Sequence, residues 1–501
     1  MIYYKVIQKG LTEGVKELDY AQAHETFISL AGNYTNKFLF ESKDVSHVYG
    51  RLSLIGVDPV LKISGKDNRF SVEKLNKRGS FYFKQLTKKD FGICDKIKME
   101  DEKITGEIEK EGNMLEEAER SKQKNIAQVI RILLEKFKIK EKSLLGLYGA
   151  FSYDFIRLFE NISDKTPPNE INDFTLFLYD TFVFFDHLKS KSEIVVFRNS
   201  EKEAEKSIAD VTKKIKKPVS GKLKYEITNP KFQLSQKEYE DMVNLAREYT
   251  KQGEIFEVVF SNILKAKFKG DPLALYLKYR ETNPSPYLFY FDADTEHLIG
   301  ASPEMMVRCE NGIVSLRPIS GTARRGNDPI EDHENMLALL SDQKERAELD
   351  MLIDLGRNDL SRVCEPGIKI TDYRFVEKYS KVMHTVAHLS GVLRKDYTAL
   401  DALICCLNAG TLTGAPKVAA MEIIEKHEKE KRGYYGGTIG YFTFSGDMDT
   451  GIIIRTAHIK NGNLRFQVGA TLLYDSVPKK EYQETLNKAE AFLNTFANTS
   501  L

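Results

Sequence analysis

The chain has 501 residues, of which 42% are hydrophobic, so it can bury a large core and has room for about two to four ordinary domains. Its 74 Lys and Arg residues almost balance 73 Asp and Glu residues, and the net charge of +1 excludes a global field that steers the protein to nucleic acid or to an anionic membrane. Five cysteines outside any CxxC spacing, no apolar leader and no run of about 18 uncharged apolar residues predict a reduced, cytoplasmic protein without a zinc site or a membrane span.

The first half of the chain reads as a sheet with charged surface segments. Residues 38–65 alternate apolar and polar side chains, which predicts strands, and a Lys- and Glu-rich region leads into an amphipathic helix over about 126–137. The aromatic run 176–197 is interpreted as two strands around a polar turn. The Lys-rich stretch 200–230, which ends at a proline, is predicted to be a linker between an N-terminal half and a catalytic half.

The second half alternates helices with long strand pairs. Helices are predicted over 235–255 and 273–283, with a strand over 256–268 between them. Near the C-terminus, 438–446 and 451–459 read as one pair of strands. Because the elements lack a repeating β-α-β rhythm, the pattern indicates an α+β fold.

Two predicted helices carry paired acids. The stretch 344–359 is predicted to be a helix followed by a tight polar turn. In this helix Glu345 and Glu348 stand three residues apart on one face, beside the apolar positions Met351, Leu352 and Leu355. The C-terminal helix repeats the spacing. It carries Glu481 and Glu484 beside a predicted buried stripe of Tyr482, Leu486, Ala489 and Leu493.

Brought together, these helices would form a cluster of up to four carboxylates with no His or Cys. Such a set of oxygen ligands suits Mg²⁺, which keeps some of its waters. From spacing alone, however, acids on a Lys-rich helix more often form a solvated face.

Seven motifs in order carry a resemblance to a known family: RPISGTARRG, KERAELDMLIDLGRNDLSRV, VMHTVAHLSG, GTLTGAPK, RGYYGGTIGY, MDTGIIIRT and EYQETLNKA. The chain resembles the chorismate-utilising enzymes, and most closely component I, the aminase subunit of anthranilate synthase. The resemblance implies an α/β/β/α sandwich of two large antiparallel sheets with helices outside. It also implies an N-terminal regulatory and partner-contacting region over 1–230, interlocked with a chorismate-binding catalytic region over 231–501.

The resemblance assigns roles to residues of the catalytic region. It places the four paired glutamates around Mg²⁺. It also implies that Arg455 and Tyr435 bind the enolpyruvyl carboxylate of chorismate. Glu304 is the implied general acid that protonates the departing ring hydroxyl, and His384 serves the loss of pyruvate. The other implied site residues are the catalytic hydroxyl of Thr322 and the substrate-binding positions Gly321, Thr411, Gly469 and Ala470.

A few positions distinguish this chain within the family. Ser320 stands where aminodeoxychorismate synthases carry a nucleophilic Lys, which disfavours the folate branch. Glu257 stands where isochorismate and salicylate synthases carry a Lys and anthranilate synthases usually carry Gln, and Leu349 and Thr471 are further departures. A carboxylate at 257 costs affinity for a dianionic substrate unless it is protonated or paired. The alternatives are an aminodeoxychorismate-type synthase that has lost its Lys and a catalytically weak tryptophan-sensing homologue.

The resemblance further implies a tryptophan site and a protein partner. The inhibitor pocket would be lined by Glu41, Ser42, Asn283, Pro286, Tyr287, Leu288 and Tyr441. Glu41 is expected to pair with the ammonium group of tryptophan, while Leu288 and Gly451 depart from the Met and Cys of some relatives. No cysteine lies in a Gly-x-Cys-x-Gly elbow, so ammonia is expected from a separate glutamine amidotransferase subunit in a hetero-oligomer.

Overall fold

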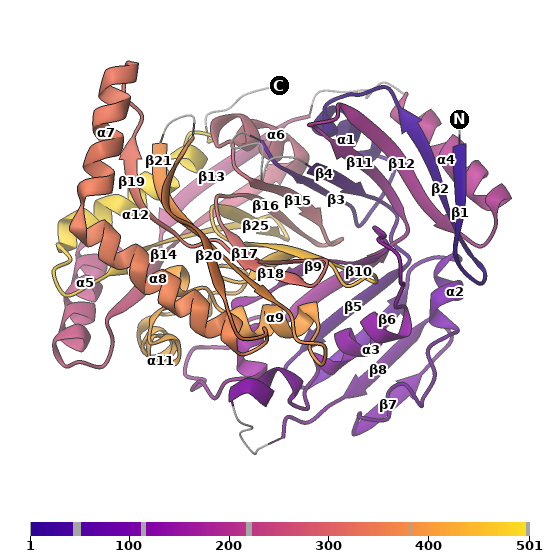
Figure 1. The fold of residues 1–501 in the computed structure, drawn as a ribbon, viewed down its shortest axis with the longest axis horizontal. Coiled ribbons are helices and arrows are strands. Elements are labelled where there is room, and N and C mark those ends of the chain that lie inside the picture. The colour runs from indigo at the N-terminus through magenta and orange to yellow at the C-terminus, as the bar shows by residue number, and fades with distance from the viewer. Residues whose placement is uncertain (1, 44–51, 112–116, 217–222, 380–381, 497–501) are drawn as a thin grey trace.

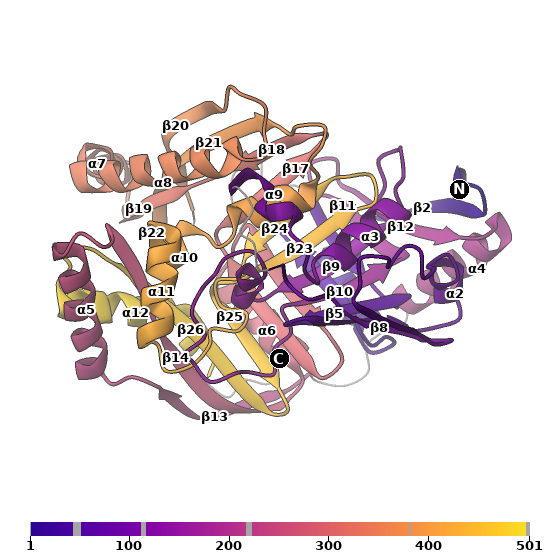
Figure 2. The same ribbon diagram turned by 90° about the horizontal axis from the view of Figure 1, so that it is seen from below.

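Two antiparallel 13-stranded sheets form the centre of the molecule, and helices lie on their outer faces (Figures 1 and 2). The structure is a computed structural model that describes residues 2–43, 52–111, 117–216, 223–379 and 382–496. The expected α+β fold with two sheets and outer helices is confirmed. No helix in these described ranges is long and apolar enough to cross a membrane.

The strands of the first sheet follow in spatial order. They are β1 (Ile2–Gln8), β2 (Leu11–Leu18), β12 (Lys191–Arg198), β11 (Thr181–Asp186), β4 (Leu52–Gly56), β3 (Phe38–Glu41), β15 (Tyr287–Asp292), β16 (Glu296–Ser302), β25 (Thr456–Lys460), β26 (Asn463–Leu472), β14 (Glu257–Gly270) and β13 (Tyr225–Phe232), with β22 (Gly414–Ala415) paired to β14.

The second sheet is built in the same way. Its strands are β19 (Ile319–Arg324), β21 (Val382–Val392), β18 (Ile313–Leu316), β17 (Met305–Glu310), β24 (Met448–Ile452), β23 (Thr438–Thr443), β9 (Gly146–Phe151), β10 (Phe174–Tyr179), β5 (Leu61–Lys66), β6 (Arg69–Lys74), β8 (Lys103–Glu107) and β7 (Lys96–Met99), with β20 (Lys369–Lys378) paired to β21.

The helices divide between the two sheets. Those in contact with the first sheet are α1 (Ala23–Ala31), α4 (Glu201–Ile215), α5 (Gln236–Lys251), α6 (Pro272–Thr282), α11 (Lys417–His427) and α12 (Pro478–Leu493). Those in contact with the second sheet are α2 (Gly79–Phe83), α7 (Pro329–Ser341), α8 (Gln343–Ser361) and α9 (Ala399–Cys406). The described part of the chain also holds α3 (Gln128–Lys136) and the short α10 (Gly410–Thr413), which contacts β14 and β26 of the first sheet.

Strands from both sides of residue 230 take part in each sheet. In the first sheet β3 pairs with β15, and in the second sheet β9 pairs with β23. Both sheets therefore continue from one half of the sequence into the other. The regulatory and partner-contacting roles of residues 1–230 stay predictions.

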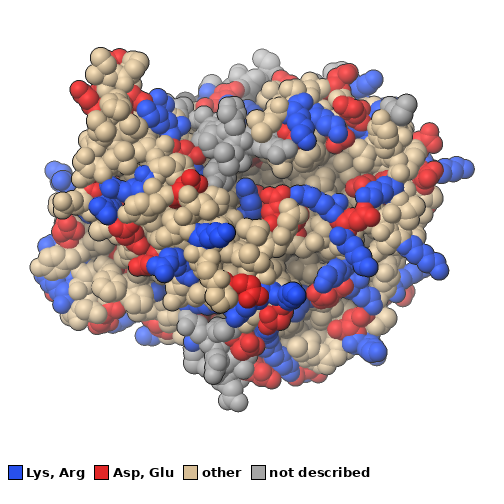
Figure 3. Space-filling view, in the orientation of Figure 1, with Lys and Arg blue, Asp and Glu red and all other residues tan. Residues whose placement is uncertain are grey.

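Aromatic rings fill the space between the sheets. Phe38 of the first sheet stacks on Tyr148 of the second, with ring centroids 5.0 Å apart, and meets Tyr179 edge-on at 4.9 Å. A Cβ atom at Gly56 would lie 2.1 Å from the Phe38 ring, so only glycine leaves room for this ring. At the surface, Lys, Arg, Asp and Glu side chains are intermingled (Figure 3), as the near-zero net charge predicts.

The predicted linker is wrong where the structure describes it. Residues 201–215 form helix α4, which buries Ala204, Ile208 and Val211 against strands β2 and β12. Pro230 lies within β13, which is an edge strand with an irregular register next to the proline, so its missing N–H breaks no inner ladder. Residues 217–222 of the stretch lie outside the described ranges.

The polar turn expected after the acidic helix is also wrong. Helix α8 continues to Ser361, and its buried apolar positions are Leu349, Leu352, Ile353, Gly356 and Leu360, among which only Leu352 belongs to the predicted set. A Cβ atom at Gly356 would lie 3.2 Å from the side chain of Leu316, so this glycine lets the helix approach the sheet closely. In α12 the buried positions are Thr485, Ala489 and Phe492, and of the predicted stripe only Ala489 is among them.

Two apolar runs that read as continuous strands are divided between the sheets. The chain leaves the second sheet at the end of β10 and enters the first at β11, with Asp180 between them. It repeats this passage between β24 and β25, where Arg455 lies in a bend. The residues 451–459 therefore do not form one strand paired with β23.

Candidate active site

Helices α8 and α12 bring the four predicted metal-binding acids into one neighbourhood, one helix from each layer. Burial raises the pKa of Glu345, and the charges of Glu348 and Glu484 raise it further. Burial likewise raises the pKa of Glu348 and of Glu481, and the Glu484 charge adds to both. The charge of Glu484 on α12 therefore acts on both Glu345 and Glu348 of α8.

Such a donor set fits a hard divalent cation, because a cation relieves the repulsion among carboxylates that burial keeps from water. Within the described ranges, no group of three or more His, Cys, Asp or Glu residues is already arranged as a metal site. Cation binding by Glu345, Glu348, Glu481 and Glu484 stays a prediction.

A lysine that the sequence reasoning missed lies at the edge of this cluster. The Lys488 ammonium donates to Glu484 Oε1 at 2.7 Å and to the Gly469 carbonyl at 2.9 Å. It stands one turn after Glu484 on α12, so the i, i+4 spacing was a signal that could have revealed it. Lys488 thus joins the acid cluster to a predicted substrate-binding glycine.

Glu304 lies in the loop between β16 and β17, where it meets a second predicted residue. Thr411 Oγ1 donates to Glu304 Oε1 at 2.9 Å, and the Ile452 N–H donates to the Glu304 carbonyl at 3.0 Å. Burial raises the pKa of the Glu304 side chain to about 7. A carboxyl group with this pKa keeps a proton near neutral pH, as a general acid requires.

His384 lies on β21 beside Thr322 and Gly321, which belong to the neighbouring strand β19. Its Nδ1 is 2.9 Å from the Gly321 carbonyl and 3.0 Å from Thr322 Oγ1. Because a carbonyl can only accept, Nδ1 carries the ring proton in this arrangement and Nε2 is the basic nitrogen of the neutral ring. Burial lowers the pKa of His384, which favours this neutral form.

The remaining predicted substrate residues gather nearby. The charge of Arg455 acts on both His384 and Tyr435, which places the guanidinium near both. A Cβ atom at position 469 would lie 2.8 Å from the Tyr435 hydroxyl, and one at position 321 would lie 3.1 Å from Glu345 Oε2. Gly321 and Gly469 therefore leave space beside the acids and the tyrosine, and Ala470 continues the same strand as Gly469.

Glu257, a departure from the family pattern, borders the acid cluster. It is the first residue of β14, it is 1% exposed, and its buried Oε2 has no hydrogen-bond partner within the residues that the structure describes. Burial, with the Glu348 charge, raises its pKa to about 8. At neutral pH the side chain is therefore mainly protonated, which removes the repulsion expected from a carboxylate beside a dianionic substrate.

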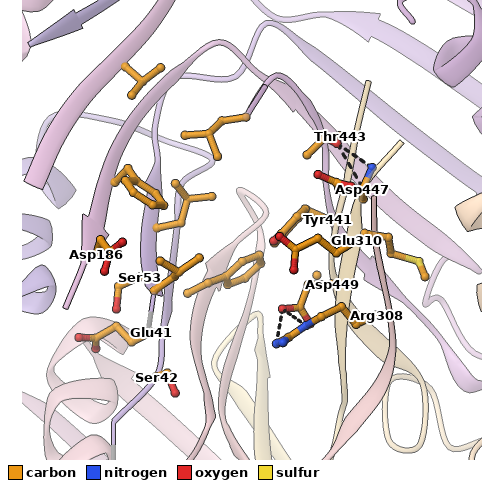
Figure 4. Close-up of a pocket in the computed structure, with 18 of the residues that line it drawn as sticks. Glu41, Ser42, Ser53, Asp186, Arg308, Glu310, Tyr441, Thr443, Asp447 and Asp449 are labelled. Carbon is orange, nitrogen blue, oxygen red and sulfur yellow. Dashed lines mark hydrogen bonds and ion pairs between the residues drawn. The ribbon is translucent and has the colours of Figure 1, made fainter. Parts of the chain in front are cut away.

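Apart from the candidate active site, a cavity of about 630 Å³ lies between the two sheets, and we refer to it as the second cavity. Six of the seven residues predicted to bind tryptophan line it, namely Glu41, Ser42, Pro286, Tyr287, Leu288 and Tyr441. Figure 4 shows Glu41, Ser42 and Ser53 on one wall, facing Tyr441 and Asp449 on the other. Asn283 is not among the lining residues, and its side chain instead donates to the Tyr279 hydroxyl at 3.1 Å.

The polar groups of this cavity differ from the expected arrangement. The Glu41 carboxylate is buried and accepts hydrogen bonds from Arg280 at 2.7 and 3.1 Å and from the Tyr276 hydroxyl at 2.6 Å. Its charge is thus already balanced within the protein. The Ser42 hydroxyl is buried and has no hydrogen-bond partner among the described residues, so it is free of any contact there that would compete with a ligand. A Cβ atom at Gly451 would lie 2.8 Å from the Tyr287 ring, so the glycine accommodates that ring.

Comparison with known proteins places this geometry in a family. The model of a family described as chorismate binding enzyme matches residues 79–494. Anthranilate synthase component 1 of Aquifex aeolicus is 42% identical over 362 residues, which cover 70% of this chain and 73% of that protein. The protein of the same name from Acetivibrio thermocellus is 36% identical over 501 residues, covering 94% of this chain and 92% of that protein.

Solved structures also match this chain. Anthranilate synthase component I from Streptococcus pneumoniae matches with a TM-score of 0.70 at 32% identity, over 88% of this chain and 92% of that one. The menaquinone-specific isochorismate synthase of Escherichia coli matches with a TM-score of 0.67 at 16% identity, over 98% of this chain and 95% of that one. At that identity the second likeness concerns the fold alone.

Proposed function

Because this chain belongs to the family of chorismate-binding enzymes, we propose that it is the aminase component of an anthranilate synthase, converting chorismate and ammonia to anthranilate and pyruvate. This reaction would be the first committed step of tryptophan biosynthesis. The observation that carries the proposal is a site with a candidate acid and a candidate base, namely the Glu304 carboxyl bonded by Thr411 and the His384 ring held at Nδ1 by the Gly321 carbonyl. Glu304 has a pKa of about 7, and His384 has a lowered pKa and a basic Nε2.

The reaction needs both groups in turn. Attack of ammonia on the ring expels a hydroxyl group, which leaves more readily when Glu304 gives it a proton. Loss of pyruvate then makes the ring aromatic, and the neutral His384 can take up the proton that this elimination releases. Thr411, which donates to Glu304, and Thr322, which lies against His384, would orient these two side chains.

The two carboxylates of chorismate need two cationic partners. Arg455, with the Tyr435 hydroxyl beside it, would bind the enolpyruvyl carboxylate. Glu345, Glu348, Glu481 and Glu484 would hold Mg²⁺, which when bound supplies positive charge to the ring carboxylate. Gly321 and Gly469 would let the substrate lie close to the main chain.

Ammonia would come from a glutamine amidotransferase subunit. Of the five cysteines, Cys309, Cys364, Cys405 and Cys406 are buried, and burial raises the pKa of each thiol. A buried thiol with a raised pKa is a poor nucleophile for glutamine hydrolysis. The second cavity would bind tryptophan as a feedback inhibitor, with the Ser42 hydroxyl as one polar contact.

The direct experiment supplies the purified chain with chorismate, Mg²⁺ and an ammonium salt and follows anthranilate by its fluorescence. We expect anthranilate to accumulate with ammonium, and no product when glutamine replaces ammonium in the absence of a partner subunit. A non-aromatic aminated product would instead favour the aminodeoxychorismate alternative. Untouched chorismate, together with tryptophan binding, would favour a sensor protein.

A further inference from the structure

Arg455 has an unusual main-chain conformation. Its φ is +50°, in the left-handed region that residues with a side chain seldom adopt. It lies where the chain passes from β24 in the second sheet to β25 in the first. A residue in such a conformation needs surrounding contacts that hold it there.

Two donors converge on the carbonyl of Arg455. The Ala301 N–H donates to it at 3.1 Å, and the Tyr279 hydroxyl donates to it at 3.1 Å. Tyr279 lies on α6 and is 1% exposed, and its ring meets Phe492 of α12 edge-on, with centroids 5.3 Å apart. Burial raises the pKa of Tyr279 to about 12, so its hydroxyl keeps its proton and remains a donor. Packing thus fixes the ring and, with it, the position of the donor.

The turn that precedes the second cavity contacts the same two residues, Tyr279 and Ala301. Asn283, the residue that caps the C-terminus of α6, donates from Nδ2 to the Tyr279 hydroxyl at 3.1 Å. Ser285 Oγ donates to the Ala301 carbonyl at 3.1 Å. The next residues, Pro286 to Leu288, form part of the cavity wall. A short hydrogen-bonded path therefore connects this wall to Arg455.

We propose that Tyr279 is a positioning residue that fixes Arg455 through its main-chain carbonyl and ties that arginine to the turn at the edge of the second cavity. The proposal rests on the proposed role of Arg455 in binding a carboxylate of chorismate. Arg455 presents its guanidinium correctly only while its carbonyl is held, and displacement of the turn at Asn283 and Ser285 loosens this hold. An occupant of the cavity that moves the turn therefore weakens chorismate binding.

The test compares Tyr279→Phe with a matched control, Tyr225→Phe. Each substitution removes one hydroxyl that donates to a main-chain carbonyl, since Tyr225 donates to Thr495 at 2.6 Å. Loss of one hydrogen bond that positions Arg455 should raise the chorismate KM about three- to tenfold in Tyr279→Phe, with kcat nearly unchanged. In Tyr225→Phe we expect a lowered melting temperature and an unchanged KM. An unchanged KM in Tyr279→Phe, with the melting temperature lowered as in the control, would overturn the proposal.

Calorimetric titration with chorismate in the absence of ammonia separates this result from the proposed reaction. Weaker chorismate binding by Tyr279→Phe supports the positioning role even if no anthranilate is formed. Equal binding by wild type and variant contradicts the role even if the reaction is confirmed.

The connection between Tyr279 and the turn is tested separately, by tryptophan binding. The chain contains no Trp, so the fluorescence of added tryptophan, excited at a wavelength that Tyr does not absorb, reports its binding without background from protein tryptophan. In Tyr279→Phe, tryptophan should still bind, but chorismate should weaken its binding less than in the wild type. An undiminished effect of chorismate in the variant would refute the connection between the turn and Arg455.

Discussion

At the residue scale, the main finding concerns Glu257. The sequence has a carboxyl where the family resemblance predicts Gln or Lys, but its protonation depends on burial and on Glu348, which comes from another element. The spacing of residues in the sequence reveals neither the burial of Glu257 nor the nearby charge of Glu348. The roles of Glu304 and His384 were expected from motifs, whereas their partners Thr411 and the Gly321 carbonyl follow from the packing of separate segments.

The raised pKa of Glu257 predicts a pH-dependent stability. Its pKa rises from an ordinary value of 4.5 to about 8 on folding, so between these pH values the folded state holds a proton that the unfolded state has lost. The free energy of unfolding therefore falls as pH rises, by at most about 1.4 kcal/mol per pH unit from this group. Glu257→Gln should become progressively more stable than the wild type from pH 5 to pH 8.

Urea unfolding at several pH values, with a chelator present, measures this difference. Glu254→Gln is the matched control, because Glu254 lies three residues earlier and is exposed. We expect the control to show a constant difference from the wild type. If the curves for Glu257→Gln and the wild type run parallel, Glu257 is ionised in the folded protein at neutral pH.

The raised pKa of Glu304 predicts that activity falls with increasing pH. Only the protonated carboxyl can donate to the leaving hydroxyl, so kcat/KM should fall as pH rises through about 7. Because unprotonated ammonia increases with pH, the profile must be measured at a fixed concentration of that form. Glu304→Gln should lower turnover by about 10²- to 10⁴-fold. A flat profile above pH 7 in the wild type, or near-normal turnover in the variant, would assign the proton to another group.

At the scale of elements, the spacing of the acids identified both helices that carry them, because i, i+3 positions share a face. The length of α8 was misjudged since GRND resembles a turn, yet Gly356 is buried against the second sheet inside the helix. The passages at Asp180 and Arg455 were missed because an apolar run looks the same whether it stays in one sheet or enters another.

The acids that α8 and α12 bring together predict that Mg²⁺ stabilises the folded protein. Mg²⁺ bound only by the folded protein should raise its melting temperature, by an amount that grows with ligand concentration. Glu348→Gln and Glu484→Gln should each remove most of this rise. Glu348→Gln should not be less stable than the wild type in chelator, because it removes a charge that burial and Glu484 disfavour.

Glu490→Gln, an exposed position on α12, is the control for the metal experiment. It should keep the full response to Mg²⁺. An equal rise in melting temperature in all four proteins would place the ion elsewhere.

At the scale of the whole molecule, both sites span the two layers. The candidate active site takes Glu348 and His384 from elements of the second sheet and Glu484 from a helix on the first. The second cavity takes Ser42 from beside β3 in the first sheet and Tyr441 from β23 in the second. The sequence resemblance predicted the two layers, but the continuity of each sheet across residue 230 emerges only from the strand pairing.

Because both sites lie between the same two layers, tryptophan and chorismate should oppose each other's binding. Thermodynamic linkage requires that each weaken the other by the same factor, typically about 5- to 150-fold. Titration of tryptophan by its fluorescence, with and without saturating chorismate, measures one factor. Calorimetric titration of chorismate, with and without tryptophan, measures the other.

Ser42→Ala tests whether tryptophan binds in the second cavity. The variant removes a buried hydroxyl that bonds no other group in the described part of the chain, so it should weaken tryptophan binding while leaving the ion pair of Glu41 and Arg280 intact. Ser53→Ala, at a cavity residue whose hydroxyl already bonds His187, is the control and should bind tryptophan nearly as the wild type does. Equal weakening in both variants would remove the specific role of Ser42. Tryptophan binding that is unaffected by chorismate would show that the shared layers do not couple the two sites.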